Sequence, residues 1–490
     1  MKFRTGLLLG TAFVVGVVVG PATLRLTGSG TFTSALAREV SSHDNSAETV
    51  RLLTLLGTVM DVVRAEYVQP VTDKDLINNA LDGMVGNLDP HSSYMTAKQF
   101  HDMQTEISGK FGGLGLQVQE ESGHVRVVSP IDGTPGARAG IQPGDFITMV
   151  DHKNIDGMTL DEAVRKMRGD PGTKISLTIV RPKTGKTLTF DLTREIVHVQ
   201  IVRSALYGST GYIRLTEFDD ALESDMKAAF EKLHADAAKA HGGKLTGLIL
   251  DLRSNPGGKL DQAIAVSDDF IKDGEIVSIR GRHPENNQRW DARGTDITDG
   301  LPIVVLTNGG SASASEIVAG ALKDHRRAVI LGEKTFGKGS VQTLIPIGDQ
   351  GAVRLTTARY YTPSGRSIQG RGIVPDIAVQ ETKDDDSYGY READLTHILT
   401  NIGGNRTADT PRTDLPAIAS SIPKKPPADW PTFDLTKPAT DFQLQQAIKV
   451  VNAMAGISNP APAIAQATEV KATKPSAPAV TSTKPPAEHR

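Results

Sequence analysis

Three short segments of this sequence carry the residue types that an acyl-transfer site needs, and each follows a predicted strand. Residues 250–258 read Leu-Asp-Leu-Arg-Ser-Asn-Pro-Gly-Gly, residues 310–316 read Gly-Ser-Ala-Ser-Ala-Ser-Glu, and residues 335–342 read Thr-Phe-Gly-Lys-Gly-Ser-Val-Gln. A strand followed by Gly-Gly and a helix leaves backbone N–H groups that can stabilise an oxyanion. A serine among small residues at the start of a helix is open to a substrate and to the helix dipole. The pattern indicates nucleophilic catalysis by a serine.

A serine nucleophile needs a base, and Lys338 is the candidate. None of the 12 histidines lies in the three segments. Lysine can act as a base if burial lowers its pKa, because only about one lysine in 10³ is neutral at pH 7 otherwise. Phe336 and the neighbouring glycines could supply that burial, and Gln342 could hold the amine by a hydrogen bond. The residues alone leave three candidates for the nucleophile, Ser311, Ser313 and Ser315.

Other charged and polar residues near these segments are interpreted as structural. We expect Asp251 and Arg253 to form an ion pair at a strand end, and Glu316 to favour the helix dipole from the first helical turn. His91 and Tyr94 are expected to fix the N-terminal helices to the rest of the protein.

The elements that must position these segments form an α/β pattern. Strands and helices alternate from about residue 193 to 380, which predicts a layered α/β domain. The continuous apolar runs at 248–250 and 303–306 predict central strands covered on both faces. We expect the chemistry at the C-terminal ends of these strands.

Two further regions precede this domain. From about residue 49 to 103 the pattern is helical, with apolar residues spaced for one buried face and Thr72 as a candidate N-cap. Between about 108 and 184, short strands are separated by glycine-rich turns, including Gly-Gly-Leu-Gly-Leu at 112–116. In such a turn, N–H groups can converge on a chain-terminal carboxylate while the next strand pairs with an extended peptide.

Composition restricts the class of protein. The chain has 490 residues, 38% of them hydrophobic and 23% charged, which is typical of a globular protein with several domains. Its net charge of −3 argues against nucleic-acid binding. It has no cysteine, which excludes disulfides and thiolate metal sites, and no motif implies a metal or another cofactor.

The N-terminus predicts export. Lys2 and Arg4 precede an apolar run from residue 6 to 20, and Ala-Leu-Ala at 35–37 fits a cleavage site. Extended through Leu24, the same run could serve as an uncleaved membrane anchor. We expect a periplasmic or otherwise exported protein, with membrane contact only through this segment.

Together these motifs resemble the C-terminal processing peptidases, also called tail-specific proteases, over roughly residues 50 to 379. The resemblance includes Leu-Asp-Pro-His-Ser-Ser-Tyr at 88–94, the PDZ-like turn and all three segments. In that family the serine lies 25 residues before the lysine, with a glutamine four residues later, which selects Ser313, Lys338 and Gln342.

The resemblance implies a fold and a set of site residues. The fold would be a layered, crotonase-like α/β protease core with an inserted PDZ domain and an N-terminal helical domain. Ser313 and Lys338 would form a catalytic dyad oriented by Gln342, with an oxyanion hole from the N–H groups of Gly258 and Ala314. The PDZ domain would bind apolar C-terminal tails of protein substrates through Gly113, Leu114, Gly115 and Leu116.

The resemblance also implies regulation and partners. Arg168, in the PDZ-like module, would couple tail binding to assembly of the active site. An activating adaptor protein and self-association of the chain are further expectations.

These observations divide the chain into six expected parts. They are a signal peptide or anchor (1–37), an N-terminal helical domain (45–107), a PDZ domain (108–184), a protease core (185–380), a partly helical C-terminal region (381–455) and a disordered tail (456–490). A helix is expected at 441–454.

Two alternatives remain at this point. A non-catalytic PDZ adaptor would bind tails without turnover, and the intact Ser, Lys and Gln set counts against it. A crotonase-like acyl-CoA enzyme would share the layers and the Gly-Gly turn, but it would need neither the lysine nor a PDZ module.

Overall fold

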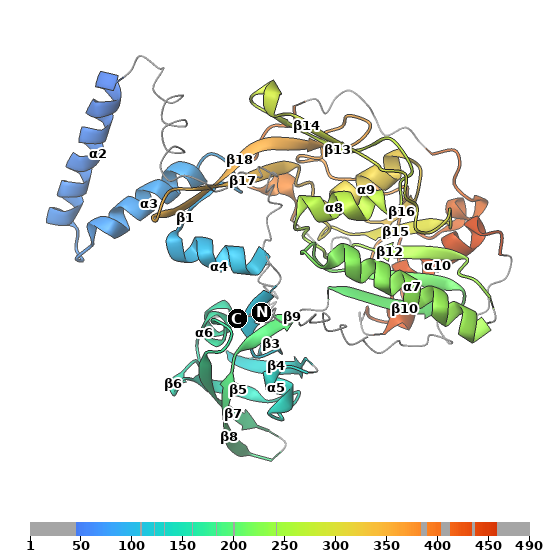
Figure 1. Ribbon diagram of the computed structural model, residues 1–490, viewed down its shortest axis with the longest axis horizontal. Coiled ribbons are helices and arrows are strands. Elements are labelled where there is room, and N and C mark those ends of the chain that lie inside the picture. Colours follow the sequence, from blue (N-terminus) through green and yellow to red (C-terminus); the bar gives the residue numbers. More distant parts are fainter. Residues whose placement is uncertain are drawn as a thin grey trace, which may run out of the picture.

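The computed structural model describes residues 46–457, apart from 108–109, 122, 132, 159, 183, 199–200, 242, 384–389, 403–411 and 434–436. The expected signal peptide or anchor and nearly all of the expected tail lie outside these residues. Figure 1 shows an N-terminal helical region, a small β module and a larger α/β body. In the part of the chain that is described, we find no helix with the length and hydropathy needed to cross a bilayer.

The N-terminal region contains three helices, α2 (Ser46–Glu66), α3 (Asp73–Gly86) and α4 (Ala97–Ile107), and the short strand β1 (Ser93–Thr96). Thr72 caps α3 as predicted, because its side chain accepts a hydrogen bond from the Asp75 N–H at 3.1 Å. The sequence analysis expected the first helix to bury one apolar face, and this expectation is wrong for the isolated chain. Val50 and Leu53 on α2 are each 62% exposed, and α2 extends away from the body (Figure 1).

The β module is a sheet in the order β3-β4-β5-β7-β8, with β6 added beside β5. Its elements are β3 (Leu116–Glu121), β4 (His124–Pro130), α5 (Pro135–Arg138), β5 (Phe146–Val150), β6 (Lys153–Asn154), α6 (Leu160–Met167), β7 (Lys174–Arg181) and β8 (Lys186–Thr193). β2 (Lys110–Gly113) and β9 (Glu195–His198) pair where the chain enters and leaves the module. β8 pairs with β7 along its whole length, so this sheet continues past the boundary expected at residue 184.

The α/β body is built on a six-stranded sheet in the order β10-β11-β12-β15-β16-β19. The strands are β10 (Val202–Tyr207), β11 (Thr210–Leu215), β12 (Gly247–Asp251), β15 (Ile303–Thr307), β16 (Val329–Gly332) and β19 (Ile377–Ala378). From β11 to β19 the strands are parallel, and the apolar runs in β12 and β15 are wholly buried, as predicted for central strands.

Helices cover both faces of this sheet. Leu250 and Val305 face a core formed with α7 (Leu222–His241), α8 (Leu260–Asp268) and α9 (Ala314–Asp324). Ile249 and Val304, one residue earlier on each strand, face a second core formed with α10 (Phe442–Met454). The C-terminal helix is therefore the second layer of the body.

A second sheet lies beside the first and carries the lysine segment. It runs in the order β1-β18-β13-β14, with β17 also paired to β18. Its strands are β13 (Glu275–Gly281), β14 (Gln288–Asp291), β17 (Ser340–Pro346) and β18 (Gly351–Tyr361). Short 3-10 helices occupy Pro284–Asn286, Glu392–Asp394, Ala417–Ser421 and Pro438–Thr440. Because β1 pairs with β18, the N-terminal region contributes a strand to the second sheet and is joined to the body through it.

Candidate active site

Ser313 lies at the N-terminus of α9 in a strained backbone conformation. Its φ is 54° and its ψ is −113°, a combination that residues other than glycine rarely adopt, and the side chain is buried. The Gly-Gly turn packs directly against it. A Cβ built at Gly257 would lie 2.8 Å from the Ala314 amide nitrogen and 2.9 Å from the Ser313 Cβ. Only glycine at position 257 lets this turn approach the serine so closely.

The other two serines of the segment are occupied by structural hydrogen bonds. Ser311 Oγ donates to Leu252 O at 2.8 Å, and Ser315 Oγ donates to Asn255 O at 2.9 Å. Ser313 is the N-cap residue of α9, and Ser315 bonds across to the segment that contains the Gly-Gly turn. Ser313 Oγ is buried and has no hydrogen-bond partner within the described part of the chain. The hydrogen bonds leave Ser313 as the available hydroxyl.

Lys338 is buried, as predicted. Burial, with the nearby Arg354 guanidinium as the next cause, lowers the pKa of Lys338 to about 8, although Glu392, Glu316 and Asp89 act in the opposite direction. At that pKa roughly one lysine in ten is neutral at pH 7, compared with about one in 10³ for an exposed lysine. The flanking glycines permit the burial, because a Cβ built at Gly339 would lie 2.3 Å from the Gln369 amide nitrogen.

Gln342 lies on β17, but its amide is bonded elsewhere. Its Nε2 donates to Ser340 Oγ at 2.9 Å and to Thr356 Oγ1 at 3.2 Å, while Oε1 is buried without a partner. Neither Ser313 Oγ nor Gln342 Oε1 accepts a hydrogen bond from Lys338. The structure brings the three residues onto neighbouring segments without joining the lysine amine to the other two side chains.

Glu316 connects the serine and lysine segments, a role that the sequence analysis missed. Its Oε2 accepts from the N–H groups of Ser313 and Lys338, each at 2.9 Å, and its Oε1 accepts from the Gly337 N–H at 2.8 Å and from Thr335 Oγ1 at 2.5 Å. Burial raises the pKa of Glu316 to about 7 despite these donors. The only signal in the sequence was an acidic residue inside a run of small residues.

The motif at 88–94 supports Gln342 from the N-terminal region. Asp89 Oδ1 accepts from Thr356 Oγ1 at 2.9 Å, and Thr356 Oγ1 accepts from Gln342. His91 Nε2 lies 2.9 Å from Glu392, and Glu392 accepts from Gln369, whose Oε1 accepts from the Gly339 N–H.

The contacts of His91 and Tyr94 agree with the expectation that these residues fix the N-terminal helices to the rest of the protein. His91 pairs with Glu392 of the body, and Tyr94 Oη donates to Gln350 O at 2.7 Å. The motif therefore fixes the N-terminal region to both sides of the lysine segment.

Of the two expected oxyanion donors, Ala314 directly follows Ser313, and Gly258 ends the turn that packs against Ser313. Ala314 is the first residue of α9, where N–H groups have no partner inside the helix. Gly258 pairs with Phe218 through its neighbours: the Phe218 N–H donates to Gly257 O, and the Lys259 N–H donates to Phe218 O. This pairing fixes the turn without using the Gly258 N–H.

The expected tail-binding loop lies at the free edge of the β module. Among the described strands, β3 pairs only with β4, so its other edge has no strand partner there and is where an extended peptide could add. Gly115 has a φ of 67°, and its carbonyl accepts from the Ile131 N–H and from Thr134 Oγ1. Gly113 ends β2 and Leu114 is buried in the module's core.

Partly buried apolar side chains of β3 and α6 pack against the module's core, and Arg168 follows α6 in the chain. Leu116 and Val118 on β3, and Leu160 and Val164 on α6, pack at the margin of the module's core. Arg168 follows α6 directly, and its N–H donates to Val164 O at 2.9 Å.

Comparison with known proteins gives the chain a family. Residues 209–379 match the peptidase family S41, residues 126–181 match the PDZ domain, and residues 19–99 match the activating protease CtpB N-terminal domain. A carboxy-terminal-processing protease of Bartonella bacilliformis is 47% identical over 405 residues, covering 82% of this chain and 92% of that protein.

A more distant relative and a solved structure are also similar to this chain. A probable CtpA-like serine protease of Staphylococcus saprophyticus is 36% identical, covering 64% of this chain and 63% of its own length. Among solved structures, a photosystem II D1 C-terminal processing protease is 30% identical, covers 64% of this chain and 84% of its own, and has a TM-score of 0.41. The match to peptidase family S41 and the 47% identity to a carboxy-terminal-processing protease favour a peptidase over an adaptor or an acyl-CoA enzyme. The chain is a serine-type peptidase with a PDZ domain, and it belongs to the C-terminal processing proteases of family S41.

Proposed function

We propose that this protein is an exported endopeptidase that binds apolar C-terminal tails of protein substrates and cleaves them through an acyl-enzyme formed on Ser313. One observation carries this proposal: Ser313 Oγ is buried without a hydrogen-bond partner in the described structure, and Glu316 binds its backbone to the segment of Lys338, a buried lysine of lowered pKa.

The proposed reaction uses Lys338 twice. Neutral Lys338 takes the proton from Ser313 Oγ as this oxygen bonds to the scissile carbonyl carbon, and the Gly258 and Ala314 N–H groups stabilise the oxyanion. Lys338 then gives the proton to the leaving amine as the C–N bond breaks. Water attacks the ester, Lys338 accepts a proton from it, and Ser313 leaves with that proton. Gln342 Oε1, buried and partnerless, would orient the amine when Lys338 turns toward Ser313.

Tail recognition is assigned to the open edge of β3. An extended peptide would add to this edge and place its carboxylate at the N–H groups of the turn 113–116, while its apolar side chains would contact Leu116, Val118 and Val164. Arg168, next to α6, would couple tail binding to assembly of the active site in the protease body. An adaptor protein that activates the enzyme would act on this same coupling between the PDZ domain and the protease body.

The N-terminal segment supports two further proposals. The apolar run at 6–20 would direct export to the periplasm, with or without cleavage after residue 37. The exposed apolar side chains of α2, among them Val50, Leu53 and Val59, would be covered by a second copy of the chain.

Products of an unfolded protein substrate test the function directly. Casein and a variant of it with an amidated C-terminus would be incubated with the enzyme and the fragments identified by mass spectrometry. The proposal expects internal cleavage of the free-carboxylate form and at least about tenfold slower cleavage of the amidated form. Equal cleavage of both would contradict tail recognition, and absence of internal cleavage would contradict endopeptidase activity.

A further inference from the structure

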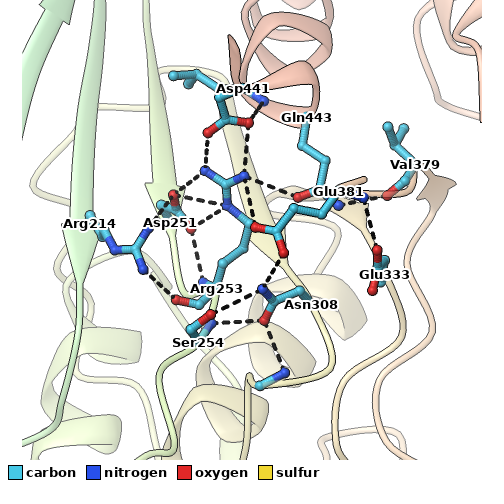
Figure 2. Close-up of polar contacts among 12 residues, drawn as sticks. Arg214, Asp251, Arg253, Ser254, Asn308, Glu333, Val379, Glu381, Asp441 and Gln443 are labelled. Carbon is cyan, nitrogen blue, oxygen red and sulfur yellow. Dashed lines mark hydrogen bonds and ion pairs between the residues drawn. The ribbon is translucent and has the colours of Figure 1, made fainter. Parts of the chain in front are cut away.

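Arg253, two residues beyond β12, is among the largest wholly buried side chains of the described structure. Figure 2 shows it between two carboxylates. Its Nε and Nη2 donate to Asp251, with the Nη2 bond at 2.6 Å, so the ion pair predicted from the sequence is confirmed. On the other side, Nη1 and Nη2 donate to both oxygens of Asp441, at 2.9 and 2.6 Å. A guanidinium that donates hydrogen bonds to two carboxylates in this way is held in one position and orientation.

Asp441 belongs to the C-terminal helix and lies beyond the residues that match family S41. It caps α10, since its Oδ1 also accepts from the Leu444 N–H at 2.9 Å. Gln443, on the first turn of α10, accepts from Arg253 Nη1 at 3.1 Å and donates to Val379 O at 2.7 Å. The start of α10 is therefore bound to the end of β12 through Arg253.

Arg253 is continuous with the Gly-Gly turn that would supply the oxyanion donor. Ser254, the next residue, has a φ of 54°, and its N–H donates to Asn308 Oδ1 at 2.8 Å. The same Asn308 oxygen accepts from the Gly310 N–H at 3.0 Å. Figure 2 shows the bond from Ser254 to Asn308; with the bond from Gly310, Asn308 thus joins the turn at 254–258 to the segment that carries Ser313.

Glu381 makes this arrangement sensitive to the charge at position 441. Its Oε2 accepts from Asn308 Nδ2 at 3.1 Å, while its Oε1 lies 3.6 Å from Arg253 Nη1. If Asp441 lost its charge, the buried guanidinium would be drawn toward Glu381 to replace the lost partner. That movement would pull on Asn308 and on the turn beside Ser313.

We propose that Asp441 is a positioning residue for catalysis, which holds the oxyanion turn in register with Ser313 by fixing Arg253. The C-terminal helix would then be a component of the active site, although it carries none of the proposed catalytic residues. This inference rests on the proposed function, because it needs an oxyanion at Gly258.

Two substitutions at position 441 separate positioning from helix capping. Asp441→Asn keeps a good N-cap but loses the charge that binds Arg253, whereas Asp441→Glu keeps the charge and is a poorer cap. Positioning predicts that Asp441→Asn lowers kcat at least about tenfold with KM within twofold, and that Asp441→Glu retains more activity. If Asp441 acted only as a helix cap, Asp441→Asn would retain more activity than Asp441→Glu.

A matched control measures the effect of stability alone. Val451→Ala removes buried apolar surface from the same helix without touching Arg253. We expect this variant to melt at least as early as Asp441→Asn while its kcat at 25 °C stays within twofold of wild type. Loss of kcat in Val451→Ala equal to that in Asp441→Asn would overturn the proposal.

Coupling to Arg253 gives a second readout. If Asp441 acts through Arg253, adding Asp441→Asn to Arg253→Lys should lower kcat less than twofold further, whereas independent effects would multiply. All variants would be compared in the full chain with a quenched fluorescent peptide that has an apolar C-terminus. A wild-type enzyme with no more turnover than Ser313→Ala would overturn the proposed function and this inference together. Turnover that Asp441→Asn leaves unchanged would overturn the inference alone.

Discussion

The backbone N–H groups of Ser313 and Lys338 donate to the same oxygen of Glu316, each at 2.9 Å. Two segments that meet only after folding are thus held by one buried carboxylate. Because a carboxylate oxygen accepts both bonds, the spacing between the serine and lysine backbones depends on this side chain.

Replacing Glu316 by Gln should lower kcat without unfolding the protein. The amide cannot accept on both sides, so at least two of the four donors to Glu316 would face an N–H₂ group or lose their bond. We expect kcat/KM to fall about 100-fold, with Glu223→Gln on α7 as a control of unchanged activity. Steady-state kinetics and circular dichroism measure the two effects, and full activity in the folded Gln variant would refute the role of Glu316.

The pH dependence of kcat/KM should report the base. Lys338, with its pKa lowered to about 8, is protonated below that pH and cannot accept the Ser313 proton. The rate should therefore rise with pH and level off above about pH 8 to 9. A profile that is flat from pH 6 to 9 would exclude Lys338 as the group that titrates.

Lys338→Met should stabilise the protein at neutral pH. The folded pKa of about 8 lies below the unfolded value of 10.5, so the unfolded state binds more protons between these values and stability rises with pH there. Below pH 8 the buried charge costs roughly 3 kcal/mol, which methionine would remove.

Calorimetry at several pH values checks this relation. The melting temperature of Lys338→Met should exceed that of wild type at pH 7, and the difference should shrink toward pH 10. Lys98→Met, at a side chain that is 80% exposed, should show no such difference. A Lys338→Met protein less stable than wild type at pH 7 would mean that the lysine is not buried as a destabilising charge.

Val164→Arg should weaken tail binding while leaving the chemistry intact. Val164 is a partly buried residue of α6, where the proposal places the apolar tail, and a charged side chain there would meet that tail. We expect the dissociation constant of a fluorescent tail peptide to increase at least about tenfold, with kcat little changed at saturation. Met149→Arg, on the interior strand β5, serves as the matched control, and equal weakening by both would move the tail site elsewhere.

Leu53→Asp tests the apolar side chains of α2. If a second copy covers this helix, a buried carboxylate would destabilise the contact, and sedimentation velocity should show a shift toward the monomer. Thr58→Asp, at an exposed polar position of the same helix, provides a comparison of equal charge. A wild-type protein that sediments as a monomer at micromolar concentration would contradict self-association through α2.

Local patterns in the sequence were enough to predict the helices and strands and to select the segments that carry Ser313 and Lys338. The apolar runs at 248–250 and 303–306 became buried parallel strands, and Thr72 caps its helix because capping depends on a residue three positions away. The positions of Gly257 and Gly339 followed from motifs whose glycines allow close backbone approach.

What the sequence did not reveal depends on distant residues. Asp441 binds Arg253 from 188 positions away, and Gly337 reaches Glu316 across 21. No periodicity encodes such contacts, so Glu316 was interpreted only as a helix-dipole charge. The apolar spacing of α2 correctly predicted a helix but not its exposure, since a pattern does not say which molecule covers a face.

Cleavage of unfolded casein by wild type, Ser313→Ala and Lys338→Ala tests the central claim most directly. The account predicts that both variants remain folded, bind a tail peptide as wild type does, and lose all but about one part in 10³ of the rate. Cleavage by either folded variant at close to the wild-type rate would contradict the Ser313–Lys338 dyad.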